Sequence, residues 1–248
     1  MAEKSVKAYL VAAGDYHDID FARLELLKLF AEVPHVRVRV AADYHDIEAI
    51  NASDFLVTYT CNLMPTEAEQ QALHAFVASG KRWFALHGTN SILRFLASGK
   101  VDSPALAPTL MQTLGTQFIA HPPIQPFRVR VADPTHPLVA GIEEFDTDDE
   151  LYLCAIHGKL HELLVTSFTG KATGFVVEDW PDDTPRPVYY LHKVGTGEVL
   201  YLNLGHCRGH YDMEPLMPYY PKIEHGSWQV PQFYELLRRG IAYCATAQ

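Results

Sequence analysis

Apolar runs and amphipathic segments alternate through the first third of the chain. Residues 6–13 and 54–60 are short, nearly continuous apolar runs, which are typical of strands buried on both faces of a sheet. Residues 20–32 and 66–80 carry apolar side chains at helical spacing, and each segment follows one of those runs. This order predicts an α/β fold with a mostly parallel central sheet and helices on both faces.

One strand stands out because it stops at a histidine. The apolar run 83–86 ends at His87, Gly88 follows it, and the residues from Ser91 onward are expected to begin another helix. A strand, a tight turn and a helix present a side chain at the carboxyl end of the strand, which is where open α/β sheets bind ligands. We therefore expect the chain to be organised around His87.

The rest of the chain is expected to add strands and one closing helix. Residues 195–197 read as the turn of a hairpin, and apolar residues within 233–241 recur at helical spacing. Residues 97–126 are less regular and are expected to form an insertion or a covering loop. No internal repeat or domain boundary is visible, so residues 1–248 are treated as one domain. The further strands are expected at 36–40, 127–131, 163–168, 174–178, 188–192 and 199–204.

Composition narrows the class of protein. The formal net charge is −10, and the 20 Lys and Arg residues are scattered, so a nucleic-acid partner is not expected. No run approaches the roughly 18 to 20 apolar residues that a membrane span needs. The four cysteines lack paired spacing, and no signal peptide is evident, so free thiols in a reducing cytoplasm are expected.

Four polar clusters each follow a predicted strand or lie in a loop near one. They are residues 15–18, His87, residues 149–150, and His206 with His210. If the strands are parallel, the clusters can converge at one edge of the sheet. Two or three imidazoles with a carboxylate suit zinc or another divalent ion, and the same groups can act as general acid and base without a metal.

These clusters supply the candidate site residues. His17, His87, His206 and Glu150 are the catalytic candidates, and the three histidines are also the candidate metal ligands. The candidates for contacting the substrate are Asp15, Asp18, His210 and Trp228.

Simpler interpretations stand beside these. The acidic run 146–150 also fits a solvated loop, and Cys207 is more often a small core residue than an activated thiol. The aromatic stretch 211–228 fits a hydrophobic lid as well as a sugar-binding cleft. Four histidines are assigned to solvated or capping positions: His35, His45, His74 and His192.

Several segments together resemble the ThuA-like (trehalose utilisation) family. The similar segments are His17-Asp18, Ala85-Leu86-His87, residues 136–141 followed by 149–152, Leu204-Gly205-His206, Ser227-Trp228-Gln229 and the helix around 238–241. The resemblance implies a class I glutamine amidotransferase-like fold of flavodoxin-like layout, with insertions near 97–126 and 207–226.

The resemblance also bears on function. His87 stands where true amidotransferases carry their cysteine nucleophile, and His206 falls where their late histidine would be, so hydrolysis of glutamine is not expected. The resemblance implies carbohydrate metabolism beside sugar oxidoreductases, and a lyase, hydrolase or isomerase acting on a 3-keto-glycoside. It implies no nucleotide cofactor.

The sequence leaves two alternatives to this enzyme open. The first is a non-catalytic module that binds a small ligand or a partner oxidoreductase. The second, ranked lower, is a hydrolase that depends on Cys207. Assembly into a homo-oligomer is also left open.

Overall fold

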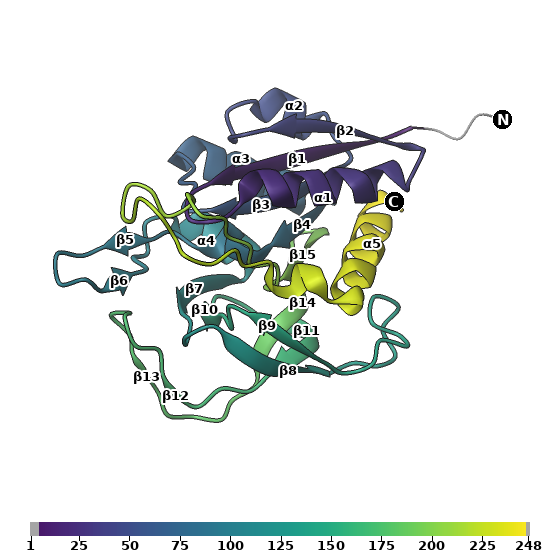
Figure 1. Cartoon of the computed structure of the whole chain (residues 1–248). Coiled ribbons are helices and arrows are strands. Elements are labelled where there is room, and N and C mark those ends of the chain that lie inside the picture. The colour runs from purple at the N-terminus through teal and green to yellow at the C-terminus, as the bar shows by residue number, and fades with distance from the viewer. Residues whose placement is uncertain (1–4, 247–248) are drawn as a thin grey trace.

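A single mixed sheet forms the centre of the protein in the computed structural model, which describes residues 5–246. The sheet has nine strands, in the order β2 (Val36–Ala41), β1 (Val6–Gly14), β3 (Phe55–Cys61), β4 (Arg82–Leu86), β15 (Gly197–Leu202), β14 (Arg186–Val194), β11 (Leu160–Thr166), β8 (Gln125–Val131) and β9 (Phe145–Asp149) (Figure 1).

The sheet is parallel in one half only. The five strands from β2 to β15 run parallel to one another, whereas the pairs β15–β14, β14–β11, β11–β8 and β8–β9 are antiparallel. The α/β class is confirmed, but the expected mostly parallel sheet describes only the first half. In the second half no helix lies between β8 and β14, and parallel pairing of successive strands needs a crossover of about a dozen residues or more, usually helical.

Helices cover both faces of the sheet, as expected. The helices α1 (Ile19–Ala31) and α5 (Pro231–Ala245) contribute to one buried apolar cluster. The helices α2 (Ile47–Asn51), α3 (Glu67–Ala78) and α4 (Pro108–Leu114) contribute to the cluster on the opposite face. The start of α3 carries the capping box that Thr66 and Glu69 predict, with both hydrogen bonds formed.

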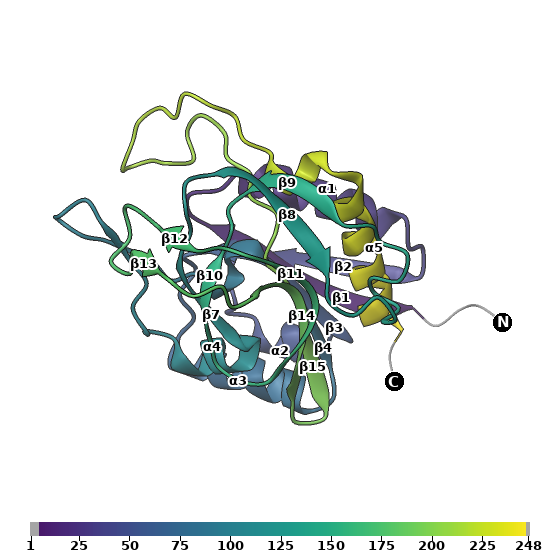
Figure 2. The same ribbon diagram turned by 90° about the horizontal axis from the view of Figure 1, so that it is seen from below.

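Short elements gather on one side of the molecule. They are the pairs β5 (Arg94–Phe95) with β6 (Val101–Asp102), β7 (Thr116–Ala120) with β10 (Leu153–Ile156), and β12 (Gly170–Lys171) with β13 (Asp179–Trp180). Figures 1 and 2 both show β5–β6, β12–β13 and the long loop between β15 and η2 (Gly226–Gln229) on this side.

Several local expectations were wrong. The chain after His87 forms the 3-10 turn η1 (His87–Asn90) and then β5, instead of a helix from Ser91. No strand spans 174–178. The irregular segment 97–126 holds α4 and β7, and Pro108 at the start of α4 and the left-handed Gly115 at its end are the standard helix boundary signals.

None of the helices within residues 5–246 combines the length and the apolar character that crossing a membrane would require.

Gly240 provides a test of the packing between α5 and β4. A methyl group at this position would overlap the buried ring of Phe84. In an open helix, replacing Gly by Ala gains up to about 1 kcal/mol, but overpacking a core costs about 1–3 kcal/mol. We expect Gly240→Ala to lower the free energy of unfolding by about 1–2 kcal/mol in urea titrations, with part of the loss restored by adding Phe84→Leu. A gain in stability for Gly240→Ala would contradict this packing.

Candidate active site

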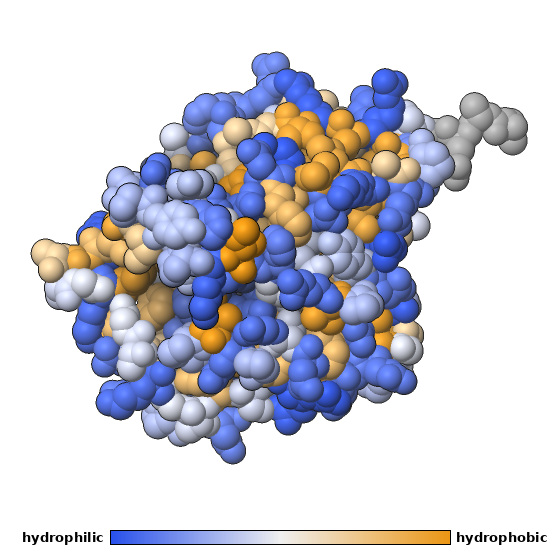
Figure 3. All heavy atoms as spheres, viewed as in Figure 1, coloured by the Kyte–Doolittle hydropathy of each residue, from blue (hydrophilic) through white to orange (hydrophobic). Residues whose placement is uncertain are grey.

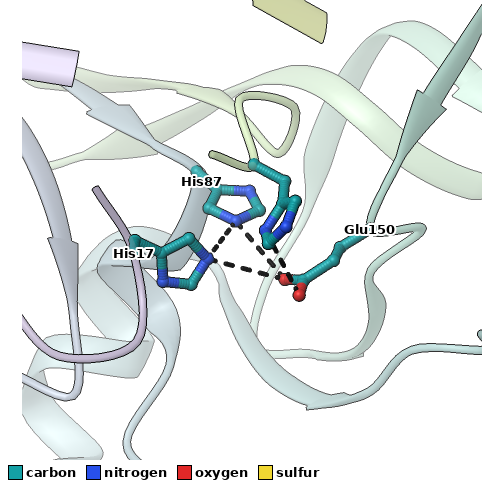
Figure 4. A group of neighbouring side chains, drawn as sticks. His17, His87 and Glu150 are labelled. Atoms are coloured by element: carbon teal, nitrogen blue, oxygen red, sulfur yellow. Dashed lines mark hydrogen bonds and ion pairs between the residues drawn. The ribbon is translucent and has the colours of Figure 1, made fainter. Parts of the chain in front are cut away.

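Four buried side chains from separate parts of the chain meet at one point. His17 lies in the loop after β1, His87 begins η1 after β4, and His206 follows β15, so all three stand at carboxyl ends of the parallel strands. Glu150 follows β9. Each of the four is at most 6% exposed. Figure 4 shows His17, His87 and Glu150 pointing toward one another.

The donor atoms of these four residues lie within 4.8 Å of one another. The Nε2 atoms of His17 and His87 are 2.8 Å apart. Glu150 Oε2 lies 3.6 Å from the first and 3.5 Å from the second, and its Oε1 lies 3.3 Å from Nδ1 of His206. The arrangement is therefore compact enough for one small cation to contact all four groups.

Each imidazole has an oxygen acceptor at its other ring nitrogen. His17 Nδ1 lies 3.3 Å from the carbonyl of Asp15, and His87 Nδ1 lies 2.9 Å from that of Asn203. His206 Nε2 lies 2.9 Å from a carboxylate oxygen of Glu224. Because carbonyl and carboxylate oxygens only accept, we assign the N–H groups to these outer nitrogens. Three lone pairs then point inward.

Such an arrangement fits a divalent metal ion. His206 Nδ1 is buried and has no hydrogen-bond partner within residues 5–246, which is unusual unless a further group occupies the site. Two facing imidazole lone pairs need a cation or a proton between them. Neutral histidines that donate their other N–H to a carbonyl or carboxylate are the usual ligands of zinc.

The protonation states agree with this assignment. Burial lowers the pKa of His17 to about 3, so its imidazole is neutral at pH 7. Burial would raise the pKa of Glu150, but the four surrounding histidines, with His206 foremost, together hold this pKa well below its ordinary value, so Glu150 is a carboxylate. Burial also raises the pKa of Tyr152 well above its ordinary value, so its hydroxyl, 3.2 Å from Nε2 of His87, stays protonated.

Asp149 holds the backbone of the site together. Its carboxylate accepts hydrogen bonds from the backbone N–H groups of Glu150, Gly205, His206 and Ser227, at 2.7–3.1 Å. The acidic run is thus a strand and not a loop, with Asp146 and Asp148 exposed and Asp149 and Glu150 buried. One carboxylate ties together the segments that carry Glu150 and His206.

Sequence reasoning missed three charged or titratable neighbours. His121 Nε2 and Arg208 Nη2 lie 3.6 Å and 3.3 Å from Glu150 Oε1, and Arg208 also pairs with Glu224. His121 follows the apolar residues of β7, and that pattern, a strand ending at a histidine, could have identified it. Arg208 and Glu224 lie in the long loop after β15, where no local pattern marks them.

A cavity of about 300 Å³ opens onto these groups, and His17, His121, Glu150, Tyr152 and Arg208 line part of it. Its volume is at the lower end of the range for small-molecule sites. Figure 3 shows the face hollowed on the side where β5 and β6 lie, with apolar side chains beside the hollow.

The four residues predicted to contact substrate do not line this cavity. Asp15 accepts a hydrogen bond from Asn62, and Asp18 caps α1 through the N–H of Phe21. His210 bonds to the carbonyl of Tyr220 within its own loop. Trp228 is only 4% exposed and packs against Phe21, Tyr59 and Phe233.

The simpler interpretations are partly right. Cys207 is a buried core residue, and burial raises the pKa of its thiol, so nothing activates it as a nucleophile. His45 is exposed and pairs with Glu69, and His74 bonds to Thr113. His192 is not solvated, because it is only 8% exposed, but one ring nitrogen faces the carbonyl of Gln112 in the last turn of α4, which fits the capping alternative.

Fold and site together define the class of protein. It is an α/β protein of the flavodoxin-like kind, with a buried histidine and glutamate centre at the carboxyl ends of its parallel strands. A family model described as "ThuA: Trehalose utilisation" matches residues 10–219. The chain therefore belongs to the ThuA family, which is linked to sugar utilisation.

Solved structures agree with the fold. A ThuA-like protein from Parabacteroides merdae ATCC 43184 has a TM-score of 0.64 and 17% identity, covering 98% of this chain and 91% of its own. One from Bacteroides uniformis ATCC 8492 has a TM-score of 0.65 and 16% identity, covering 98% and 93%. A β-galactosidase from Rahnella sp. R3 has a TM-score of 0.52 and 13% identity, covering 97% of this chain but 31% of its own. At these identities the likeness shows the fold alone. No curated protein matches the chain.

The buried His17 predicts a pH dependence of the metal-free protein. Its pKa is about 3 in the folded chain, against an ordinary value of 6.5, so between these values only the unfolded chain binds the proton. Stability must then rise with pH through this window and fall as the solution is acidified. In urea titrations with a chelator present from pH 7 to pH 4, we expect His17→Gln to lose less stability than the wild type. Equal losses in the two proteins would contradict the assignment.

Proposed function

We propose that this protein is a metal-dependent enzyme that cleaves an oxidised sugar, a 3-keto-glycoside, by removing the proton next to the keto group. The observation that carries the proposal is the convergence of three imidazole lone pairs and one carboxylate beside a cavity. The family's link to sugar utilisation supports a sugar derivative as substrate. With no thiol at position 87, the chemistry of amidotransferases is not proposed.

His17, His87, His206 and Glu150 would hold the metal. Three nitrogen donors and one carboxylate match the preference of zinc. A divalent ion bound there would act as a Lewis acid and stabilise the negative charge that develops on the keto oxygen.

The proton transfer falls to residues outside this set. His121 lines the cavity, and its Nδ1 atom donates to the carbonyl of Pro122 at 2.7 Å, so its Nε2 atom carries a free lone pair. We assign His121 the role of base. It takes the proton from C2 of the sugar, and the electron pair moves toward the keto group to give an enolate with a double bond between C2 and C3.

The enolate then re-forms the keto group, a double bond forms between C1 and C2, and the bond between C1 and the glycosidic oxygen breaks, so this oxygen needs a proton. Tyr152 lines the cavity and keeps its phenol protonated, so it is the candidate donor. The products are an unsaturated keto sugar and a free alcohol, and atoms balance without water. Later addition of water to the double bond would give the hydrolysis product.

Arg208 positions Glu150 and does not take part in proton transfer. Its guanidinium contacts Glu150 and Glu224 and donates to the carbonyl of Tyr16. Arg208 therefore links the glutamate of the site to the glutamate that orients His206. A buried charge with these partners keeps Glu150 facing the three histidines.

Metal content and turnover test the proposal together. We expect the wild type, dialysed against zinc and then freed of excess metal, to hold one ion per chain and to turn over a 3-keto-glycoside. His87→Ala and His206→Ala should lose the ion, and turnover should fall by about 10²-fold or more. His35→Ala, in the turn before β2 and remote from the site, is the matched control and should behave as the wild type.

Two outcomes would contradict the enzyme. A wild-type protein that binds no metal and shows no turnover above His87→Ala would favour the non-catalytic module. Full metal content in both His87→Ala and His206→Ala would remove the site on which the proposal rests.

A further inference from the structure

The cavity has two chemically different parts. The part described above carries the charged and titratable groups around Glu150. The remaining wall is apolar and is lined by Leu93, Phe95, Val101, Phe118, Phe175 and Met213. The proposed reaction uses only the polar part, so the apolar wall has no role in it.

Packing between separate elements fixes this wall. Phe118, on β7, meets Phe175 edge to face with ring centroids 5.8 Å apart. Val101, on β6, forms a β-bridge with Phe175. Phe95, on β5, packs edge to face on Tyr16 with centroids 5.0 Å apart, yet 38% of it stays exposed. The wall is therefore a preformed surface, and Phe95 leaves part of its ring free to contact a ligand.

The wall is poor in partners for hydroxyl groups. Among the described residues that line the cavity there is no Asp, Asn, Gln, Lys or Trp, and the hydroxyl groups in the lining are those of Tyr16, Ser91 and Tyr152. The two charged residues that line it, Glu150 and Arg208, pair with each other at 3.3 Å. A second sugar unit would bring several hydroxyl groups, and each hydroxyl buried without a partner costs affinity.

We propose that the apolar wall is a binding subsite for the aglycone of the substrate, and that this aglycone is an apolar aromatic group. The inference rests on the proposed function, because it places the sugar ring at the polar part of the cavity. The substrate class is then the glycoside of a phenol or another hydrophobic alcohol, and not an oligosaccharide. The partly exposed ring of Phe95 is available for the edge-to-face contacts that aromatic rings prefer, and Phe118 and Phe175, which are 3% and 7% exposed, form the buried part of the wall.

Binding of unoxidised glycosides tests the subsite without turnover. Calorimetry on the full-length, zinc-loaded protein compares phenyl glucoside with methyl glucoside of the same anomeric configuration, and with trehalose as a two-sugar probe. We expect phenyl glucoside to bind about tenfold or more tighter than methyl glucoside, because the phenyl ring is removed from water. Trehalose should bind no tighter than methyl glucoside.

Variants of the wall identify the surface responsible. Phe95→Ala, at a half-exposed position, should abolish most of the preference for the phenyl group and leave the affinity for methyl glucoside unchanged. Phe175→Leu should reduce the preference in the same direction. Val177→Ala, at a residue that is 46% exposed and outside the cavity lining, is the control and should keep the preference.

Three results would overturn the subsite: trehalose binding tighter than phenyl glucoside, an equal loss of affinity for both glucosides in Phe95→Ala, or no binding of any of the three probes.

The test also separates the two proposals. A phenyl preference that depends on Phe95, in a protein without turnover of 3-keto-glycosides, leaves the subsite standing and removes the proposed reaction. Turnover of 3-keto-glycosides without a phenyl preference removes the subsite and leaves the proposed reaction standing.

Discussion

Two imidazole nitrogens, from His17 and His87, face each other at 2.8 Å in the buried centre of the molecule. Both rings have their other nitrogen committed to a backbone carbonyl, so neither has a second proton to place between them. Two lone pairs at this distance repel unless a positive charge lies between them. The pKa of His17, lowered to about 3 by burial, makes a proton a poor choice at neutral pH. A divalent metal ion, as proposed, would satisfy this constraint, and His206 and Glu150 would be its other ligands.

Much of the fold serves to hold these groups in place. The parallel half of the sheet brings His17, His87 and His206 to one edge, because β1, β4 and β15 all end there. The antiparallel half supplies Glu150 at the end of β9. Asp149 joins the two halves through four backbone N–H groups, so the fourth side chain is fixed relative to the histidines. His87 itself adopts a left-handed backbone with φ of 44°, a strained conformation for a non-glycine residue. Strain of this kind is common where function requires a particular orientation of a side chain.

The sequence predicts the parallel half of the fold well, because buried parallel strands are continuous apolar runs and their helices are amphipathic. His17, His87, Glu150 and His206 could be proposed because each follows such a run or closes an acidic strand. The antiparallel half is harder to predict. The pairing of β14, β11, β8 and β9 depends on contacts between residues far apart in the chain. The role of Trp228 could not be predicted from the sequence either, because an aromatic residue in a loop can pack in the core or contact a ligand equally well. His121 was overlooked because its strand lies in a segment whose proline and threonine content suggested a loop.

The proposed function depends on His87, together with His17, His206 and Glu150, forming a metal centre at the carboxyl ends of the parallel strands. X-ray absorption at the zinc edge of the zinc-loaded protein tests this most directly. The account predicts a first shell of three imidazole nitrogens and carboxylate oxygen at about 2.0–2.2 Å, with at least one nitrogen lost in His206→Ala. A shell of oxygen ligands without imidazole, or one that is the same in His206→Ala, would contradict it.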